Sequence, residues 1–257
     1  MTAEAWLRLA LVPAVVWLAS LAARRWGHTV SGYLGGLPLI GGPITLYLAL
    51  DHGAEFAARS AVVTLAAIVG QAAHLTLFTY MGRRERWPVA LTAGWTGFTV
   101  AAIAVALLPL TPGIALILAA VSLAAAFRAI PRPDGEASLP AVPAVELRLR
   151  LAAALVLAIA ILWSAPEFGP VVSGVLLSVP VTGSIMPPFT LALYGPGAVA
   201  RLTRGFVVGL TGFSAFFFVV GCCAVSLGIT RTFVFAVAAA LATVFVMSRM
   251  VIWVGRR

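Results

Sequence analysis

Long apolar runs separated by short polar segments make up almost the whole chain. A transmembrane helix needs about 20 predominantly apolar residues to cross the hydrocarbon core of a bilayer. Nine runs approach this length, and they predict transmembrane helices at residues 5–23, 29–50, 58–80, 87–108, 112–130, 147–165, 170–194, 203–227 and 230–254. The longest polar stretch, residues 131–146, is rich in proline and divides the nine into two groups. The pattern therefore predicts an all-α polytopic membrane protein.

The composition agrees with this class. Of the 257 residues, 62% are hydrophobic and only 10% are charged, whereas about 25% of the residues of a soluble domain are charged. So few charges could not cover the surface of a protein of this size in water. The lipid bilayer is therefore the expected partner of most of the surface.

The positions of the arginines predict how the chain crosses the membrane. Thirteen arginines fall in the loops after the first, third, fifth and seventh predicted helices and in the C-terminal tail: Arg24, Arg25, Arg83, Arg84, Arg86, Arg128, Arg132, Arg148, Arg150, Arg201, Arg204, Arg256 and Arg257. The other side holds Arg8, Arg59 and Arg231. Basic residues concentrate in cytoplasmic loops. We expect a bacterial inner membrane protein with a periplasmic N-terminus and a cytoplasmic C-terminus, and no nucleic-acid partner.

The chain also repeats itself with a shift of 142 positions. Between residues 27 and 70 this shift gives eleven identities without a gap, including the pairs Gly32/Gly174, Pro38/Pro180, Gly41/Gly183, Gly53/Gly195 and Arg59/Arg201. Shared helix breakers in one register indicate an internal repeat. Four predicted helices fall in each repeat, with one helix between them, so the second repeat would cross the membrane in the opposite direction. The sequence therefore predicts a 4+1+4 architecture of inverted repeats: residues 1–110, a linker helix and loop at 111–146, and residues 147–257.

The helix breakers of this repeat have two explanations. Transporters built from inverted repeats often carry interrupted helices at corresponding positions, with the freed backbone groups facing a cavity near the midplane. Alternatively, glycine pairs such as Gly32/Gly36 and Gly205/Gly209 allow neighbouring helices to pack closely. On the cavity interpretation, the candidate solute-binding residues in the two interrupted helices are Pro38, Gly41, Gly42, Pro180, Thr182, Gly183 and Ser184.

Three further polar or aromatic residues lie deep within predicted helices. His74 and Gln71 are three positions apart and share one helix face, so they could couple protons or bind solute, or they could form a hydrogen bond between helices. Trp95 could line a cavity or pack between helices.

Arg59 and Arg201 each follow an interrupted helix, and each could bind an anionic group or anchor its helix at the membrane interface.

No pattern of catalytic residues is recognisable, and we expect neither an enzyme nor a bound cofactor or metal ion. The HExxH, GxSxG and GxxxxGK motifs are absent, as is an inward pair of carboxylates. The adjacent Cys222 and Cys223 lie in an apolar segment and do not form a set of metal ligands.

The stretch from Gly32 through "LPLIGGP" to "HGAEFAAR" resembles the short bacterial GlpM-type membrane proteins, with the matching positions Gly32, Pro38, Gly53 and Arg59 repeated at Gly174, Pro180, Gly195 and Arg201. Those proteins are about as long as one repeat, so the resemblance implies a fused, inverted pair. The family is loosely associated with exopolysaccharide production. The architecture is also similar to that of the inverted-repeat drug/metabolite transporters, although no glutamate lies at mid-depth in the first helix.

Two functions follow from this pattern. A secondary transporter of a small amphipathic or lipid-like solute predicts a cavity between the two interrupted helices and alternating access around them. A non-catalytic accessory subunit of an envelope or exopolysaccharide assembly predicts filled halves and a docking face. A homodimer or a partner in such an assembly is compatible with either function.

Overall fold

The computed structural model describes Trp17 and residues 26–133 and 143–255 of the chain, and within these residues it is all-helical. Six of the described helices are long and apolar enough to cross a membrane, as a polytopic membrane protein requires. Several predicted features lie outside the described residues: the helix at 5–23 except Trp17, Arg8, Arg24 and Arg25, most of the polar stretch, and Arg256 and Arg257. The count of nine transmembrane helices therefore stays a prediction.

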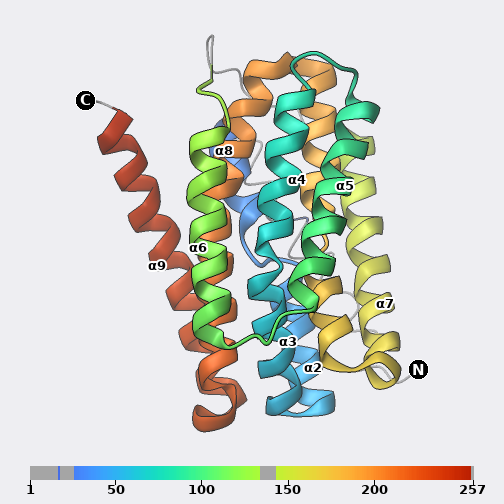
Figure 1. Ribbon diagram of the computed structural model, residues 1–257, viewed down its shortest axis with the longest axis vertical. Helices are drawn as coiled ribbons and strands as arrows, with labels where there is room; N and C mark the ends of the chain where they lie inside the picture. The colour runs from blue at the N-terminus through green and yellow to red at the C-terminus, as the bar shows by residue number, and fades with distance from the viewer. Residues whose placement is uncertain (1–16, 18–25, 134–142, 256–257) are drawn as a thin grey trace.

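The first half contains one interrupted helix followed by three further helices. Residues 26–36 are helical, residues 37–40 are not, and α2 (Gly41–His52) then continues to the end of the bundle. The chain reverses at Gly53, whose φ of 89° is the left-handed conformation that favours glycine. It returns through α3 (Ala54–Ala66) and α4 (Ile68–Met81), and α5 (Trp87–Ala106) runs back down the bundle (Figure 1).

The second half follows α6 (Pro112–Ala129) and consists of α7 (Ala144–Leu177), α8 (Val181–Leu227) and α9 (Ile229–Gly255). Two of these helices contain a reversal of the chain, at Gly169 with a φ of 71° and at Gly195 with a φ of 75°. The helices after Gly53 and Gly195 begin earlier than the predicted starts at residues 58 and 203, because the left-handed glycines, and not the polar residues behind them, end the preceding helices.

Proline sets the geometry of both interruptions. It has no backbone N–H and cannot continue a helix without losing a hydrogen bond. The Leu39 N–H donates to the Leu37 carbonyl, and the Val181 N–H donates to the Val179 carbonyl, each over 2.8 Å. Each bond closes a three-residue turn around the proline, and the φ of −78° and ψ of 59° at Pro180 are those of an inverse γ-turn. The non-helical backbone expected at both prolines is present.

Other backbone features also recur at a spacing of 142 residues. Left-handed glycines occur at Gly27 and Gly169, and again at Gly53 and Gly195. Helices α5 and α9 begin at Trp87 and Ile229, which are also 142 positions apart. In Figure 1, α5 descends from its junction with α4 whereas α9 ascends to the C-terminus, so the two corresponding helices run in opposite directions.

Glycines allow the first segment of each interrupted helix to approach a helix of the other half. A Cβ atom added at Gly32 would lie 2.2 Å from the Leu202 carbonyl oxygen of α8. A Cβ atom added at Gly174 would lie 2.6 Å from the Ser60 carbonyl oxygen of α3. Residues 32 and 174 are 142 apart, and so are 60 and 202. The close packing proposed for Gly32, Gly36, Gly205 and Gly209 is present, because Gly36 and Gly209 also face each other.

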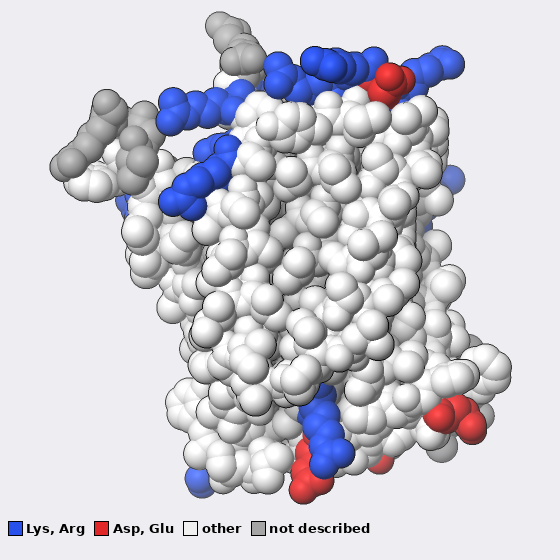
Figure 2. Space-filling view, viewed as in Figure 1, with Lys and Arg blue, Asp and Glu red and all other residues white. Residues whose placement is uncertain are grey.

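The outer surface is apolar between two charged ends. Figure 2 shows a broad white belt with arginines gathered at one end, which we call the arginine-rich end. This is the end where α4 joins α5 and where α6 terminates, with Arg83, Arg84, Arg86 and Arg132 in the connecting segments. The turn between α2 and α3, with Asp51, Glu55 and Arg59, lies at the opposite end. Large exposed apolar side chains along α5, α7 and α9 match the surface that a bilayer would cover.

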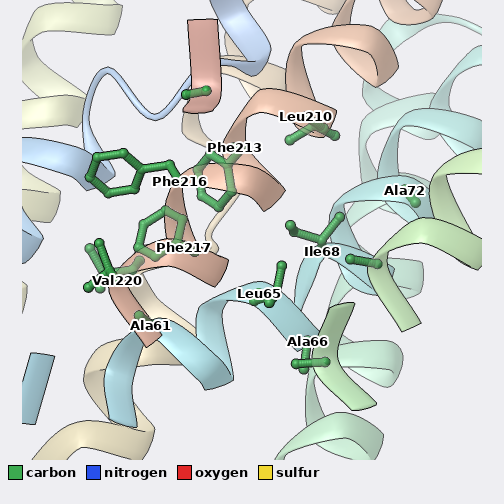
Figure 3. Close-up of a cluster of buried hydrophobic side chains, with 14 of the residues drawn as sticks. Ala61, Leu65, Ala66, Ile68, Ala72, Leu210, Phe213, Phe216, Phe217 and Val220 are labelled. Atoms are coloured by element: carbon green, nitrogen blue, oxygen red, sulfur yellow. The ribbon is translucent and has the colours of Figure 1, made fainter. Parts of the chain in front are cut away.

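The core lies where α3 and α4 meet α8. Figure 3 shows Leu65 and Ile68 facing Phe213 and Phe217 across this contact, and Phe217 and Ile68 are fully buried. The phenylalanines of α8 pack edge-to-face or tilted against one another, with ring centroids of Phe213 and Phe217 4.5 Å apart. Helix α3 and the part of α8 after Gly195 therefore pack closely together in the core.

Candidate functional site

Both interruptions line one cavity of about 70 Å³ near the centre of the bundle. Leu39 and Gly41 face it from the first interruption, and Pro180, Thr182 and Gly183 face it from the second. Because one water molecule needs about 10–15 Å³ by this measure, the cavity has room for about five waters or a solute of a few heavy atoms. The two interrupted segments thus border a cavity and do not simply pack against each other.

The cavity wall is mostly apolar. Much of the wall consists of apolar side chains from two helices: Leu157 of α7, and Met186, Phe206 and Phe213 of α8. The polar side chains that the described residues place on the wall are Ser31, Gln71, Arg150 and Thr182. An apolar wall with a few polar groups is typical of sites for small molecules.

Gln71 secures the second interruption. Its Nε2 donates a hydrogen bond of 2.9 Å to the carbonyl oxygen of Ser178, the residue that directly follows the last helical residue of α7. A backbone carbonyl freed by a helix break needs such a donor inside a membrane protein. Gln71 therefore holds the backbone of the interruption in place while it also faces the cavity.

His74 makes a similar contact from a position behind the cavity. Its side chain is 0% exposed, and its Nε2 lies 3.2 Å from the carbonyl oxygen of Gly183, to which it donates. The Nδ1 atom has no hydrogen-bond partner. The ring packs edge-on against Trp95, with centroids 6.1 Å apart. The hydrogen bond between helices that the sequence allowed is present, and His74 is not among the residues that line the cavity.

Among the described residues that line the cavity, Arg150 is the charged one. It lies in the second turn of α7, is only 5% exposed, and forms an ion pair with the buried Glu146 one helical turn earlier. A buried ion pair is costly to form, and ionisable groups buried in a membrane protein are therefore candidate functional residues.

The cavity lies on the side of the interruptions that faces the arginine-rich end. Within the described chain, α2 contributes only its first residue, Gly41, and the helix after Gly169 contributes only its last residue, Leu177. Residues on the other side of the interruptions contribute several groups, including Ser31, Met186 and Arg150. The described lining residues therefore lie mostly on the side of the interruptions that faces the arginine-rich end.

The structure brings together some of the predicted site residues and separates others. Gly41, Gln71, Pro180, Thr182 and Gly183 line the cavity. Pro38, Gly42, His74, Trp95 and Ser184 lie beside it without lining it: Gly42 packs under the ring of Phe216, and the Ser184 hydroxyl is buried without a hydrogen-bond partner.

The two interface arginines lie far from each other. Arg59 is exposed at the end where α2 turns into α3. Arg201 is half-buried on α8, six residues after the turn at Gly195, which Figure 1 shows at the arginine-rich end. Neither lines the cavity, so the question of anchoring or anion binding concerns two separate surfaces.

Arg150 and Ser31 are cavity residues that the sequence did not identify. Arg150 was counted among the loop arginines, but it is buried within α7. The signal that could have found it is the spacing of Glu146 and Arg150, since residues four apart on a helix face each other. The same spacing occurs 142 positions earlier, at Glu4 and Arg8, which lie outside the described residues.

The described residues contain no group of three or more His, Cys, Asp or Glu side chains that could hold a metal ion. Comparison of the chain with protein-family models, with curated proteins and with solved structures gives no match. The functional argument therefore rests on the geometry of the cavity.

Proposed function

We propose that the protein is a secondary transporter that moves a small amphipathic solute by alternating access around its two interrupted helices. The observation that carries this proposal is the central cavity lined by both interruptions. Backbone interrupted at membrane depth is tolerated where it lines a cavity, and solute sites of many transporters are built in this way.

We propose further that the two halves are inverted repeats. The shared spacing of the proline turns, the left-handed glycines and the starts of α5 and α9 supports this. The exchange of packing partners supports it as well, since Gly32 lies on Leu202 while Gly174 lies on Ser60. A two-fold axis in the membrane plane would generate such an exchange.

Transport by alternating access requires a second conformation, in which the cavity faces the opposite side of the membrane. Inverted repeats can produce this conformation when the two halves exchange their conformations. In the present structure the cavity lies toward the arginine-rich end, which we assign to the cytoplasm. If the halves exchange conformations, residues 142 positions away take over the wall. Ser173 would then replace Ser31, and Ile44 would replace Met186, on the opposite side of the membrane.

The cavity favours the transporter over the accessory subunit. An accessory protein predicts filled halves, whereas here the two interruptions surround empty space of molecular size. The volume also favours a solute of a few heavy atoms over a lipid-sized one.

Solute flux into proteoliposomes tests the proposal. The purified protein is reconstituted, and uptake of propionate, propionamide and n-propylammonium is compared with that of protein-free liposomes. We expect at least one of these to enter faster. Thr182→Trp, which fills the cavity, should abolish that uptake, while Gly113→Trp at an open position on α6 should leave it unchanged. Equal flux through protein-containing and empty vesicles for all three solutes would contradict the proposal.

A further inference from the structure

The surface at the arginine-rich end carries a set of exposed basic side chains. Three arginines stand in the short connection between α4 and α5, and two more lie at the C-terminal end of α6: Arg83, Arg84, Arg86, Arg128 and Arg132. We call these five residues the arginine rim. Figure 2 shows the basic side chains of this end along the border of the apolar belt, where the headgroups of a bilayer would lie.

The nearby acidic residues do not balance the charge of the arginine rim. None of its five arginines forms an ion pair with a described carboxylate. Glu85 stands in the connection between α4 and α5, and Asp134 and Glu136, which follow Arg132 in the sequence, lie outside the described residues. Counting all three acids against the five arginines still leaves the rim positive.

Two exposed aromatic residues stand next to the arginine rim. Tyr80, in the last turn of α4, is 49% exposed, and Trp87, the first residue of α5, is 45% exposed. Tyrosine and tryptophan concentrate at the level of the headgroups, where the ring meets apolar chains and its polar group meets water. An acidic soluble protein would use only the charges, whereas a lipid uses both the arginines and the rings. The pattern therefore favours a lipid partner.

We propose that the arginine rim binds anionic phospholipids. The guanidinium groups donate paired hydrogen bonds to the phosphate oxygens, and Tyr80 and Trp87 pack against the adjoining acyl chains. A zwitterionic headgroup offers the same phosphate but adds an ammonium group, which the arginines repel. Each basic residue close to an anionic membrane surface strengthens binding by roughly fivefold. This interaction concerns the outer surface of the protein and does not depend on transport.

The phospholipids that stay bound to the purified protein measure this preference. The protein is reconstituted into vesicles of equal parts phosphatidylglycerol and phosphatidylethanolamine, extracted in a mild detergent, and its bound lipids are quantified by mass spectrometry. We expect an excess of phosphatidylglycerol of about fivefold. Arg84→Gln combined with Arg86→Gln should lower this excess below about twofold. Arg59→Gln combined with Arg231→Gln, which changes two exposed arginines at the opposite end, should leave it at the wild-type value.

A charge-conserving variant separates lipid binding from an effect on folding. Arg84→Lys combined with Arg86→Lys keeps both charges and should keep the excess of phosphatidylglycerol, and all variants are compared as monodisperse preparations. Equal amounts of the two lipids on the wild-type protein, or an unchanged excess on the double glutamine variant, would overturn the proposal. Binding of soluble polyglutamate to the same arginines, without an excess of phosphatidylglycerol, would overturn it in favour of an acidic protein partner.

Discussion

At the scale of single residues, the polar side chains inside the bundle satisfy backbone groups that helix ends and interruptions leave free. Gln71 donates to the Ser178 carbonyl at the second interruption, and His74 donates to the carbonyl of Gly183 in the first turn of α8, where Pro187 has no N–H to offer. Arg204 does the same for a helix end: its Nη1 donates to the carbonyl oxygens of Phe127 and Ile130, each over 2.9 Å, at the C-terminus of α6. The guanidinium also lies 4.0 Å from the centroid of the Phe127 ring.

Replacing Arg204 should loosen α6 from α8. Arg204→Met removes both donors and leaves two carbonyl groups without their partner, so we expect the free energy of unfolding to fall by about 1–3 kcal/mol. Thermal unfolding measures this change. Arg148→Met, on an exposed surface of α7, serves as the control and should stay near the wild type. Equal stability of the two variants would show that the contact contributes nothing.

One substitution distinguishes a role of His74 in helix packing from a role in proton coupling. The position equivalent to His74 in the second half is Phe216, so His74→Phe places the residue of one half into the other. Because the hydrogen bond to Gly183 would be lost, we expect a lower unfolding temperature with solute uptake retained. Loss of uptake in a variant that unfolds at the wild-type temperature would instead assign proton coupling to His74.

At the scale of helices, glycine decides how closely the interrupted helices pack. Because Gly32 and Gly36 have no side chain, the first segment of the first interrupted helix lies directly against the backbone of α8. The second segment, α2, begins again at the cavity.

Alanine at Gly32 should therefore destabilise the protein. Its Cβ atom would lie 2.2 Å from the Leu202 carbonyl oxygen, and relieving this overlap requires the helix to move, at a cost of about 1–3 kcal/mol. The matched change Gly113→Ala on α6, where a Cβ atom meets nothing within 4 Å, should leave stability equal or slightly higher. Unfolding of both variants at one temperature would contradict the packing argument.

The proline turns should lower the stability of the protein and support solute transport. Pro38→Ala and Pro180→Ala restore a backbone donor at each interruption, so we expect straighter helices, a raised unfolding temperature and slower solute uptake. Thermal unfolding and proteoliposome uptake measured on the same preparation test both effects. Faster uptake by the double variant would show that the interruptions are not needed for transport.

At the scale of the whole molecule, the sequence predicted the class and the interruptions better than the site. Apolar runs locate helices, and Pro38 and Pro180 mark the breaks, because these signals act on the local chain. Arg150 was missed, since only the packed bundle turns its side chain toward the cavity. His74 and Trp95 lie within α4 and α5, but their helix faces point behind the cavity wall, which depends on how α4 and α5 rotate against α8.

The arginine-rich end predicts the orientation of the chain in the membrane. A reporter fused after Arg257 should be cytoplasmic, and one inserted at Asp51, at the opposite end of the bundle, should be periplasmic. Fusions of an enzyme active only in the periplasm test both positions. A periplasmic C-terminus would contradict the assigned orientation and the odd number of transmembrane helices.

Accessibility of two equivalent positions tests alternating access most directly. In a background with Cys222 and Cys223 replaced by serine, Ser31→Cys and Ser173→Cys are introduced singly and labelled in oriented vesicles with a small, membrane-impermeant thiol reagent. Ser31 lines the present cavity, and Ser173 is its equivalent in the packed half. We predict that each single-cysteine variant reacts from one side, with opposite sides for the two variants. Failure of Ser173→Cys to react from the periplasmic side, while Ser31→Cys reacts from the cytoplasmic side, would contradict alternating access.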